Sequence, residues 1–447
     1  MHPEWQYRMI KQLKPRDTQT RVKHLILAEY LSAWSGIIVH GLRSHAQKAR
    51  SLGKPFTIHL VYVDGFAGCG MYGGDRGELL LRRADRPVFG SPIIGVQGLD
   101  KIKGFAWEKY RLHVETNAIL AEIDPTSFKT LLQSLKMAGL GDRIKTVARF
   151  ESLRDDEIAL LNCDFHEVVD RALEYTADHT FAFYLLDPRG PKGIPFDVVR
   201  PIIKQHRTDV MINFPYQDLH KKAGILLGKE MDSRRQALIG NYTRMFGSEQ
   251  WKELYRDAYH SSSKMKEQGR IVERALVNHY ENVLQSADAK LLVKQVGLRF
   301  PDRDRTMFYL FLTTHDPTGA LKLNEILDQA KVREHALRLE YQDARELART
   351  RQVGQIDFLE LVPRFHGGEL PRGHDVDIAA IAERLYQQFQ GRTVQLREVA
   401  GSMANSPYYF SDIKKALTHL KRSDKAKYGR LRSLNSQIQF PIERGST

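Results

Sequence analysis

The sequence predicts a doubly wound α/β sheet, mostly parallel, that ends in a β-hairpin and is followed by a C-terminal winged-helix domain. Three observations support this fold class. Short apolar runs alternate with helical patterns along much of the chain. A charged, helix-prone insertion at 215–290 precedes two strand-like runs, which the sequence PDRDRT joins. Residues 374–447 then contain three short helical patterns, followed by a segment at 425–442 that alternates like a two-stranded wing.

Each element is predicted from its hydrophobic period. The strand-like runs lie at 58–66, 117–124, 181–188, 210–214, 291–300 and 307–315. The helical patterns lie at 22–49, 125–139, 320–350, 378–389, 394–404 and 408–422. A Gly- and Pro-rich loop at 363–373 is a natural domain boundary. These patterns divide the chain into a basic helical region (1–57), an α/β domain (58–330), a helix with a linker (331–373) and the winged-helix domain (374–447).

The composition is that of a soluble globular protein, with 42% hydrophobic and 27% charged residues in 447. No apolar run approaches the roughly 20 residues that cross a bilayer, and the first residues lack the apolar core of a signal peptide. Two cysteines cannot form a disulfide framework or a four-cysteine metal site. We expect a cytoplasmic protein with no membrane partner.

The net charge of +14 is concentrated at the two ends of the chain. Residues 1–60 contain 10 Lys or Arg and 3 Asp or Glu, and residues 370–447 contain 13 and 7. The middle of the chain is nearly neutral. This distribution favours a polyanionic partner, such as DNA or RNA, held by the ends. General basicity of the protein is the alternative.

The most informative motif is DGFAGCG, which follows the first predicted strand. Glycines there let the backbone approach a ligand at the carboxyl edge of the sheet. The motif resembles the glycine loop of class I S-adenosylmethionine-dependent methyltransferases, in which the loop lies under the methionine part of the cofactor. An ordinary glycine turn is the alternative. The implied cofactor contacts are Asp64, Gly65, Phe66, Ala67, Gly68 and Gly70.

Acidic residues follow the second predicted strand and also occur further along the chain. After the second strand, Glu122 is favoured as the acceptor for the ribose hydroxyls, while Asp124 is equally suited to capping the next helix. Asn162-Cys163-Asp164-Phe165, between the runs at 117–124 and 181–188, lies at the spacing expected for the end of a third strand, where Asp164 would face the adenine amino group and Phe165 would lie beside the ring. A solvated turn is the alternative for this pair.

The helix that follows the glycine loop is expected to begin at Gly90-Ser91-Pro92, because Ser and Pro are good helix-start residues. Ser91 is therefore a further cofactor-binding candidate. About 20 residues separate this start from the loop. We expect this segment to form either a flap over the cofactor or a phosphate contact, and an ordinary solvated loop is the alternative. The basic residues of the segment are Arg76, Arg82, Arg83 and Arg86.

The fourth strand ends in LLDPRG. Amino-methyltransferases of nucleic acids carry [D/N]-P-P-[Y/F] at this place, so the resemblance implies that Asp187 and Pro188 hold the target amine. Arg189 and Gly190 replace the second proline and the aromatic residue that would stack a flipped base. Asn213, in the VMINF run, is the third catalytic candidate. An Asp-Pro turn is the structural alternative for Asp187.

No metal site is predicted, because His179, Asp187 and His206 have no recognisable ligand spacing. Cys69 and Cys163 lack the Pro-Cys setting needed for attack on a pyrimidine. Buried small apolar residues are the better interpretation of both cysteines.

Several motifs in order resemble the three-Cys-motif partner proteins (TcmP), which have a methyltransferase-like core. The motifs include YVDGFAGCG, FGSPIIG, LAEIDP, LLDPRG and MFYLFLTTHDPTG, and the resemblance spans roughly residues 20–330. It implies a class I methyltransferase-like sheet in the α/β domain. It also implies a separate partner that contains the three-cysteine motif and is thought to be radical-enzyme-like.

The third helical pattern of the C-terminal domain, 408–422, has one apolar face and a basic remainder. This fits the third helix of a winged helix, which commonly enters a nucleic-acid groove. The expected phosphate contacts are Lys414, Lys415, Lys421 and Arg422. A winged helix used for protein contacts is the alternative.

The expected function is therefore S-adenosylmethionine-dependent methylation of nucleic acid, DNA or RNA. The alternative is a non-catalytic, nucleic-acid-binding accessory of a three-Cys-motif protein. A nuclease would need a metal-binding carboxylate cluster, and the sequence shows no recognisable one.

Overall fold

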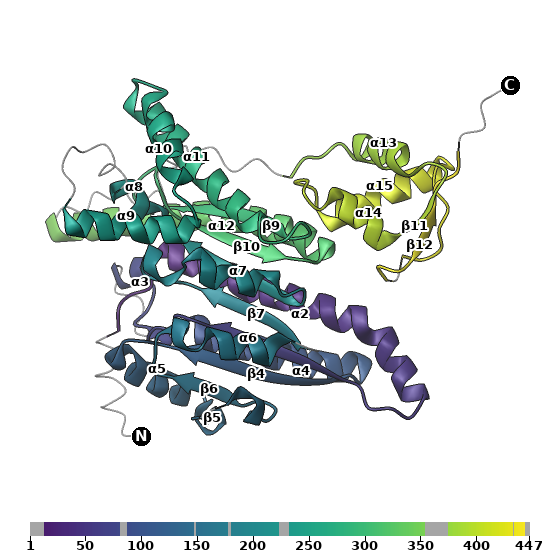
Figure 1. Ribbon diagram of the computed structural model, residues 1–447, viewed down its shortest axis with the longest axis horizontal. Helices are drawn as coiled ribbons and strands as arrows, with labels where there is room; N and C mark the ends of the chain where they lie inside the picture. The colour runs from purple at the N-terminus through teal and green to yellow at the C-terminus, as the bar shows by residue number, and fades with distance from the viewer. Residues whose placement is uncertain are drawn as a thin grey trace.

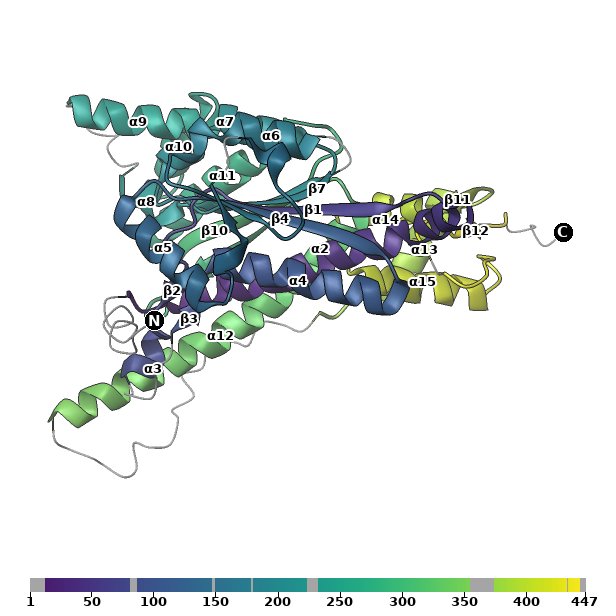
Figure 2. The same cartoon turned by 90° about the horizontal axis from the view of Figure 1, so that it is seen from below.

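A computed structural model describes residues 13–80, 87–146, 149–177, 180–222, 232–353, 374–431 and 433–442. Eight strands form one sheet in the order β5-β6-β4-β1-β7-β8-β10-β9, and helices cover both of its faces (Figures 1 and 2). Neighbouring strands are parallel except where β10 pairs with β8 and β9. The predicted mixed α/β fold with a mostly parallel sheet is confirmed.

The parallel strands β1, β4, β7 and β8 are buried along most of their length, because helices cover both faces of the sheet. The strands are β1 (Thr57–Asp64), β4 (His113–Ala121), β5 (Ile144–Lys145), β6 (Ile158–Leu161), β7 (Thr180–Leu186), β8 (Thr208–Phe214), β9 (Leu292–Arg299) and β10 (Thr306–Thr314). The chain first builds outward from β1 through β4 and then returns to place β7 on the other side of β1. The switch point of the sheet therefore lies between β1 and β7.

One layer of helices covers each face of the sheet (Figure 2). One layer packs into the first apolar core and consists of α2 (Thr18–Ser51), α4 (Ser91–Tyr110), α5 (Pro125–Met137) and α12 (Pro317–Val353). The second layer consists of α6 (Val169–Ala177), α7 (Phe196–Lys204), α8 (Tyr216–Lys222), α9 (Ser233–Phe246), α10 (Gln250–His260) and α11 (Met265–Gln285). The last four of these helices occupy the region expected to be a helical insertion.

Helix α2 is long and apolar enough to cross a membrane by length and composition. It is a core helix here, because Val22, Ile26, Leu27 and Tyr30 are at most 1% exposed and pack against the sheet and its neighbouring helices. The described residues form a globular α/β structure. The cytoplasmic location stays a prediction.

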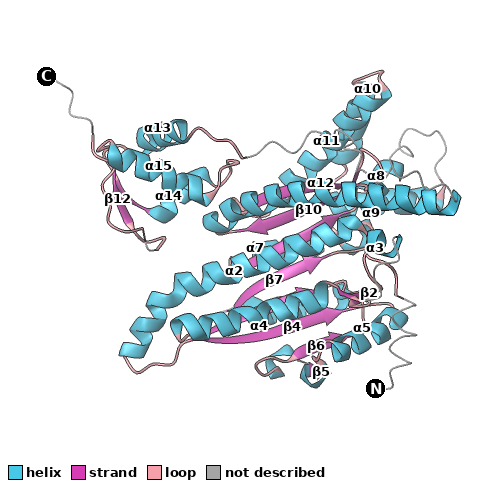
Figure 3. Ribbon diagram, turned by 180° about the vertical axis from the view of Figure 1, so that it is seen from behind, coloured by secondary structure: helices cyan, strands magenta, loops and turns pink. Residues whose placement is uncertain are grey.

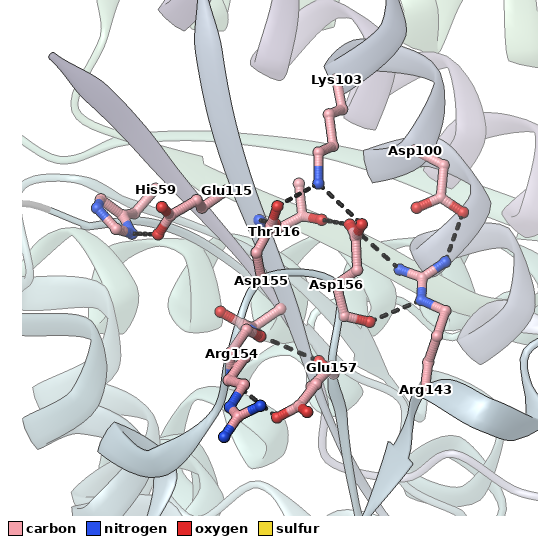
Figure 4. Close-up of polar contacts among 11 residues, drawn as sticks. His59, Asp100, Lys103, Glu115, Thr116, Arg143, Arg154, Asp155, Asp156 and Glu157 are labelled. Carbon is pink, nitrogen blue, oxygen red and sulfur yellow. Dashed lines mark hydrogen bonds and ion pairs between the residues drawn. The ribbon is translucent and has the colours of Figure 1, made fainter. Parts of the chain in front are cut away.

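Ion pairs tie α4 to the loop before β6 (Figure 4). The Lys103 ammonium lies 2.5 Å from Asp155 and 2.8 Å from Asp156. The Arg143 guanidinium lies 2.8 Å from Asp100, on α4, and its Nε donates to the Asp156 carbonyl. These contacts lie near the amino ends of the parallel strands, away from the glycine loop.

The C-terminal domain is a separate group of helices and strands (Figure 3). Its side chains form an apolar core that Leu321 of α12 joins. Its elements are α13 (Ile378–Phe389), β11 (Thr393–Gln395), α14 (Leu396–Met403), α15 (Phe410–Arg422) and β12 (Gln437–Gln439). The domain docks on α12, where the Asn324 amide donates to the carbonyls of Ser406 and Tyr408, both at 2.8 Å.

Two details of this domain differ from the prediction. Residues 393–395, partly expected to be helix, form β11, which pairs with β12. The expected two-stranded wing at 425–442 is reduced to β12 and a single bridge between Lys427 and Gln439. Between the bridge and β12, Tyr428, Leu431 and Leu434 pack against the domain core at intervals of three residues, which the two-residue period of a strand does not allow.

Two glycines in α4 test the packing of this helix on the sheet. A Cβ added at Gly95 would lie 2.2 Å from the Tyr62 ring, which is fully buried, whereas a Cβ at exposed Gly104 would meet nothing within 4 Å. We expect Gly95→Ala to lower the free energy of unfolding by about 1–3 kcal/mol through overpacking. Gly104→Ala should raise it by about 0.5–1 kcal/mol. Urea denaturation measures both, and equal effects of the two variants would contradict this packing.

Candidate functional site

A cavity of about 770 Å³ opens at the carboxyl ends of β1, β7 and β8. This is the edge of an open α/β sheet where ligands bind, beside the switch point. Its lining comes from the glycine loop, the first turns of α2 and α5, the ends of β7 and β8, and the start of β10. Candidates that line it are Phe66, Ala67, Gly68, Gly70, Ser91, Asp124, Asp187, Pro188 and Asn213.

The glycine loop needs glycine at particular places. Gly68 and Gly70 have φ angles of +61° and +74°, in the left-handed region that side chains disfavour. A Cβ on Gly70 would also lie 2.8 Å from the Leu131 side chain of α5. A Cβ on Gly65 would lie 2.8 Å from the Phe165 ring. The loop therefore presents its backbone to the cavity and packs closely on both sides.

The buried Glu122 carboxylate lies behind this loop. The Glu122 carboxylate accepts the Gly68 N–H at 2.7 Å and the Asp124 N–H at 2.9 Å. Glu122 is not among the cavity-lining residues, whereas Asp124 is, and the Asp124 carboxylate caps α5 by accepting the Ser127 N–H at 2.8 Å. Of the two acids, Asp124 is thus the one at the cavity surface and Glu122 the one that holds the loop.

Asp64 ends β1 and is also buried behind the loop. Its carboxylate accepts hydrogen bonds from the Tyr62 hydroxyl and the Phe66 N–H, both at 3.1 Å. Burial raises its pKa to about 6, although hydrogen bonds from Ser91, Phe66 and Tyr62 oppose this effect. Asp64 therefore joins the end of β1 to the start of α4, which begins at Ser91 as its first residue with Gly90 as the cap.

The Asp187 carboxylate is held from two sides. One oxygen accepts from the Lys23 ammonium of α2, and the other accepts from the Asn213 amide at 2.6 Å. Burial tends to lower the pKa of Lys23, but the nearby Asp187, Tyr72 and Asp64 raise it overall, so the ammonium stays charged. The Asn213 Oδ1 is buried and has no hydrogen-bond partner among the described residues.

Several residues of this site have no signal in the sequence, among them one cation and two aromatic side chains. Lys23, Tyr72 and Phe308 line the cavity but come from α2, from the segment after the glycine loop and from β10. The Lys23 ammonium lies 5.7 Å from the centre of the Phe308 ring. The residues lie far apart along the chain, so the sequence carries no local signal for their meeting.

Asp164 and Phe165 lie outside the residues that line the cavity. Asp164 accepts the His166 N–H at 3.1 Å and so caps a short turn. Phe165 is 2% exposed, and its ring centre lies 6.0 Å from that of Phe66. Phe165 therefore supports the glycine loop by packing against Gly65 and Phe66. Of the four arginines between the loop and α4, only Arg76 is among the described residues, and it pairs with Asp17 at 2.6 Å.

The basic candidates of the C-terminal domain are all exposed and lie on α15. Lys414 lies 4.7 Å from the centre of the Phe410 ring, and Lys415 lies 3.7 Å from Asp412. Lys421 donates to the Tyr428 carbonyl at 2.7 Å. The side chains line one exposed stretch of α15, whose apolar face is buried in the domain core.

No protein family model matches the sequence, and no curated protein matches it. Among solved structures, a match is the crystal structure of a protein from Legionella pneumophila str. Philadelphia 1, assigned to the DUF519 family. The two share 12% identity with a TM-score of 0.37, over 71% of this chain and 92% of that chain. Similarity at this level identifies neither a family nor an activity.

The raised pKa of Asp64 predicts a pH-dependent stability. The folded state binds the Asp64 proton more tightly than the unfolded state does, so its contribution to stability is lost as the pH rises from about 4 to about 6. Asp64→Asn removes this titration. We expect the stability of the variant, relative to the natural protein, to rise by up to about 3 kcal/mol across that range. Urea unfolding at several pH values measures it, and parallel pH curves would contradict the assignment.

Proposed function

We propose that the chain is an S-adenosylmethionine-dependent methyltransferase of nucleic acid, whose C-terminal domain is a winged helix that engages the substrate. The observation that carries the proposal is the cavity of about 770 Å³ at the switch point, between the glycine loop and Asp187. Its volume lies within the range of about 300–1,000 Å³ that is usual for cofactor and ligand sites. Its glycine-rich wall suits a ligand that approaches the backbone closely.

The cofactor end of the cavity is assigned to the glycine loop and the start of α5. Backbone groups of Gly68 and Gly70 would lie against the amino-acid part of the cofactor, with Asp64 and Glu122 holding the loop from behind. Asp124, Thr126 and Thr130 line the adjoining wall. Their carboxylate and hydroxyl oxygens are suited to the hydroxyls of a ribose.

The transfer end is assigned to Asp187 and Asn213. The sulfonium of the bound cofactor supplies an activated methyl group, so the protein's task is mainly to position the acceptor. The Asn213 Oδ1, which has no partner among the described residues, can accept a hydrogen bond from a target amine. Lys23 would hold the Asp187 carboxylate in position beside that amine.

The cavity also contains aromatic side chains that can contact a base. The LLDPRG motif lacks the aromatic residue found at that place in nucleic-acid amino-methyltransferases. Phe66 and Phe308 line the same cavity from the glycine loop and from β10. Stacking of a flipped base on aromatic rings contributes about 1–3 kcal/mol per base. We assign this role to Phe66, because it is half-buried, whereas Phe308 is only 7% exposed and belongs to the apolar core.

Substrate engagement is assigned to the exposed side of α15. The three helices and the β11–β12 pair support a winged-helix arrangement, in which the third helix enters a groove. Lys414, Lys415 and Arg422 point outward from the domain core and can neutralise phosphates. Lys421 is bonded to Tyr428 and contributes less directly.

Binding without transfer is the second candidate function. It is favoured by one observation: both Asp187 oxygens already accept hydrogen bonds, one from a buried ammonium. In that case the chain binds nucleic acid as an accessory of a three-Cys-motif protein, the partner that the TcmP resemblance implies.

The first test distinguishes transfer from binding. Asp187→Asn keeps the size and turn chemistry of the side chain but removes its charge. We expect the rate of methyl transfer in a single turnover to fall on the order of 10²-fold, with little change in S-adenosylmethionine affinity. The matched control is Asp197→Asn, at an exposed position in α7. A transfer rate equal to that of the natural protein, in a folded variant, would exclude a charge-dependent role.

The second test concerns the phosphate contacts. Replacing Lys414 and Lys415 by Ala should weaken duplex binding and reduce the slope of log affinity against log salt by about two. Arg384→Ala is the matched control, because it removes one positive charge from an exposed position of α13, elsewhere in the same domain. Fluorescence anisotropy over a salt series measures the slopes. Unchanged slopes for the double variant would show that α15 does not contact phosphates.

A further inference from the structure

Three side chains of metal-binding type meet at the other edge of the sheet, away from the glycine loop. His206 lies in the turn before β8, Asp288 lies between α11 and β9, and His315 directly follows β10. Because β10 runs antiparallel to β8, the end of β10 meets the beginning of β8. One ligand atom from each of the three side chains lies within 4.8 Å of the other two.

His315 is the best defined member of this group. Its side chain is 7% exposed, and neither ring nitrogen has a hydrogen-bond partner among the described residues. The Asp288 Oδ2 lies 3.8 Å from its Nε2, which is too far for a hydrogen bond. The His206 and His315 ring centres are 5.0 Å apart. A buried imidazole without a partner is costly, so a missing bonding partner is expected at this place.

The Asp288 carboxylate is arranged to leave one oxygen for this partner. Its Oδ1 accepts the Lys290 N–H at 2.7 Å, while its Oδ2 is the atom nearest His315. A backbone hydrogen bond to one oxygen orients a carboxylate whose other oxygen binds a metal. Two imidazoles and one carboxylate are the ligand types that zinc takes in three-ligand sites.

We propose that His206, Asp288 and His315 bind one divalent cation of the zinc class, with water as the fourth ligand. Zinc–nitrogen and zinc–oxygen bonds of about 2.0–2.2 Å place tetrahedral ligand atoms roughly 3.3 Å apart. The three groups must therefore move closer together than they are in this conformation. His206 is exposed and its side chain can rotate to make most of this movement.

The bound ion would clamp three segments of the chain together. It joins the turn before β8, the loop between the helical insertion and β9, and the end of the reversed strand β10. The next residue, Asp316, caps α12 by accepting the N–H groups of Thr318 and Gly319 at 2.8 and 3.0 Å. The clamp therefore fixes the start of the helix on which the C-terminal domain docks.

Zinc titration of the chelator-treated, full-length protein tests the proposal. Calorimetry should give one saturable site, and zinc should raise the melting temperature. His206→Ala removes an exposed ligand with little risk to folding, and it should lower zinc affinity at least tenfold. The control His45→Ala, exposed on α2, should bind zinc like the natural protein.

Cobalt provides a second readout, because tetrahedral cobalt with nitrogen and oxygen ligands has visible absorption bands much stronger than those of the hydrated ion. The natural protein should give these bands, and Asp288→Asn should lose or shift them. Two results would overturn the proposal: no saturable zinc uptake by the natural protein, or equal zinc affinity in His206→Ala and His45→Ala.

Discussion

A largely buried ion pair between Lys23 and Asp187 joins helix α2 to the end of β7 in the wall of the cavity. Removing two charges from water costs several kcal/mol per ion, so such a pair contributes little net stability. The pair is nevertheless placed where α2, the glycine loop and the carboxyl ends of β7 and β8 meet. It fixes the position of Asp187 and ties α2, which precedes the sheet in the chain, into the wall of the cavity. The site and the helix that precedes the sheet are therefore parts of one unit.

The acidic residues around the glycine loop divide between supporting and lining roles. Asp64 and Glu122 are buried, and their oxygens accept the backbone N–H groups of Phe66 and Gly68. Asp124 faces the cavity and caps α5. These carboxylate contacts hold the loop in shape. The loop also packs closely on α5, because Gly70 has no side chain to collide with Leu131. A rigid backbone wall of this kind can bind a ligand without reorganising.

Much of the fold followed from local patterns. Each predicted strand of the sheet overlaps an observed strand, because apolar runs between turn signals leave few other structures for a buried segment. The glycine loop and Asp187 were also found, since they directly follow such runs. The sequence could not show which of Glu122 and Asp124 lines the cavity, because both acids follow the same strand end. The difference arises only when the loop folds and the Gly68 N–H bonds to Glu122. Lys23, Phe308 and the group around His315 depend on contacts between distant segments, for which the sequence has no spacing signal.

Titration of the full-length protein with S-adenosylmethionine tests the central claim, that the glycine-loop cavity is a cofactor site. Gly68 and Gly53 form a matched pair for this measurement, with φ angles of +61° and +65° and open space around an added Cβ. Alanine at either position introduces similar backbone strain, but Gly68 lines the cavity and Gly53 follows α2, outside the cavity lining. The account predicts binding at one site, unchanged in Gly53→Ala and weakened at least tenfold in Gly68→Ala. No saturable binding by the natural protein, or equal affinities of the two variants, would contradict it.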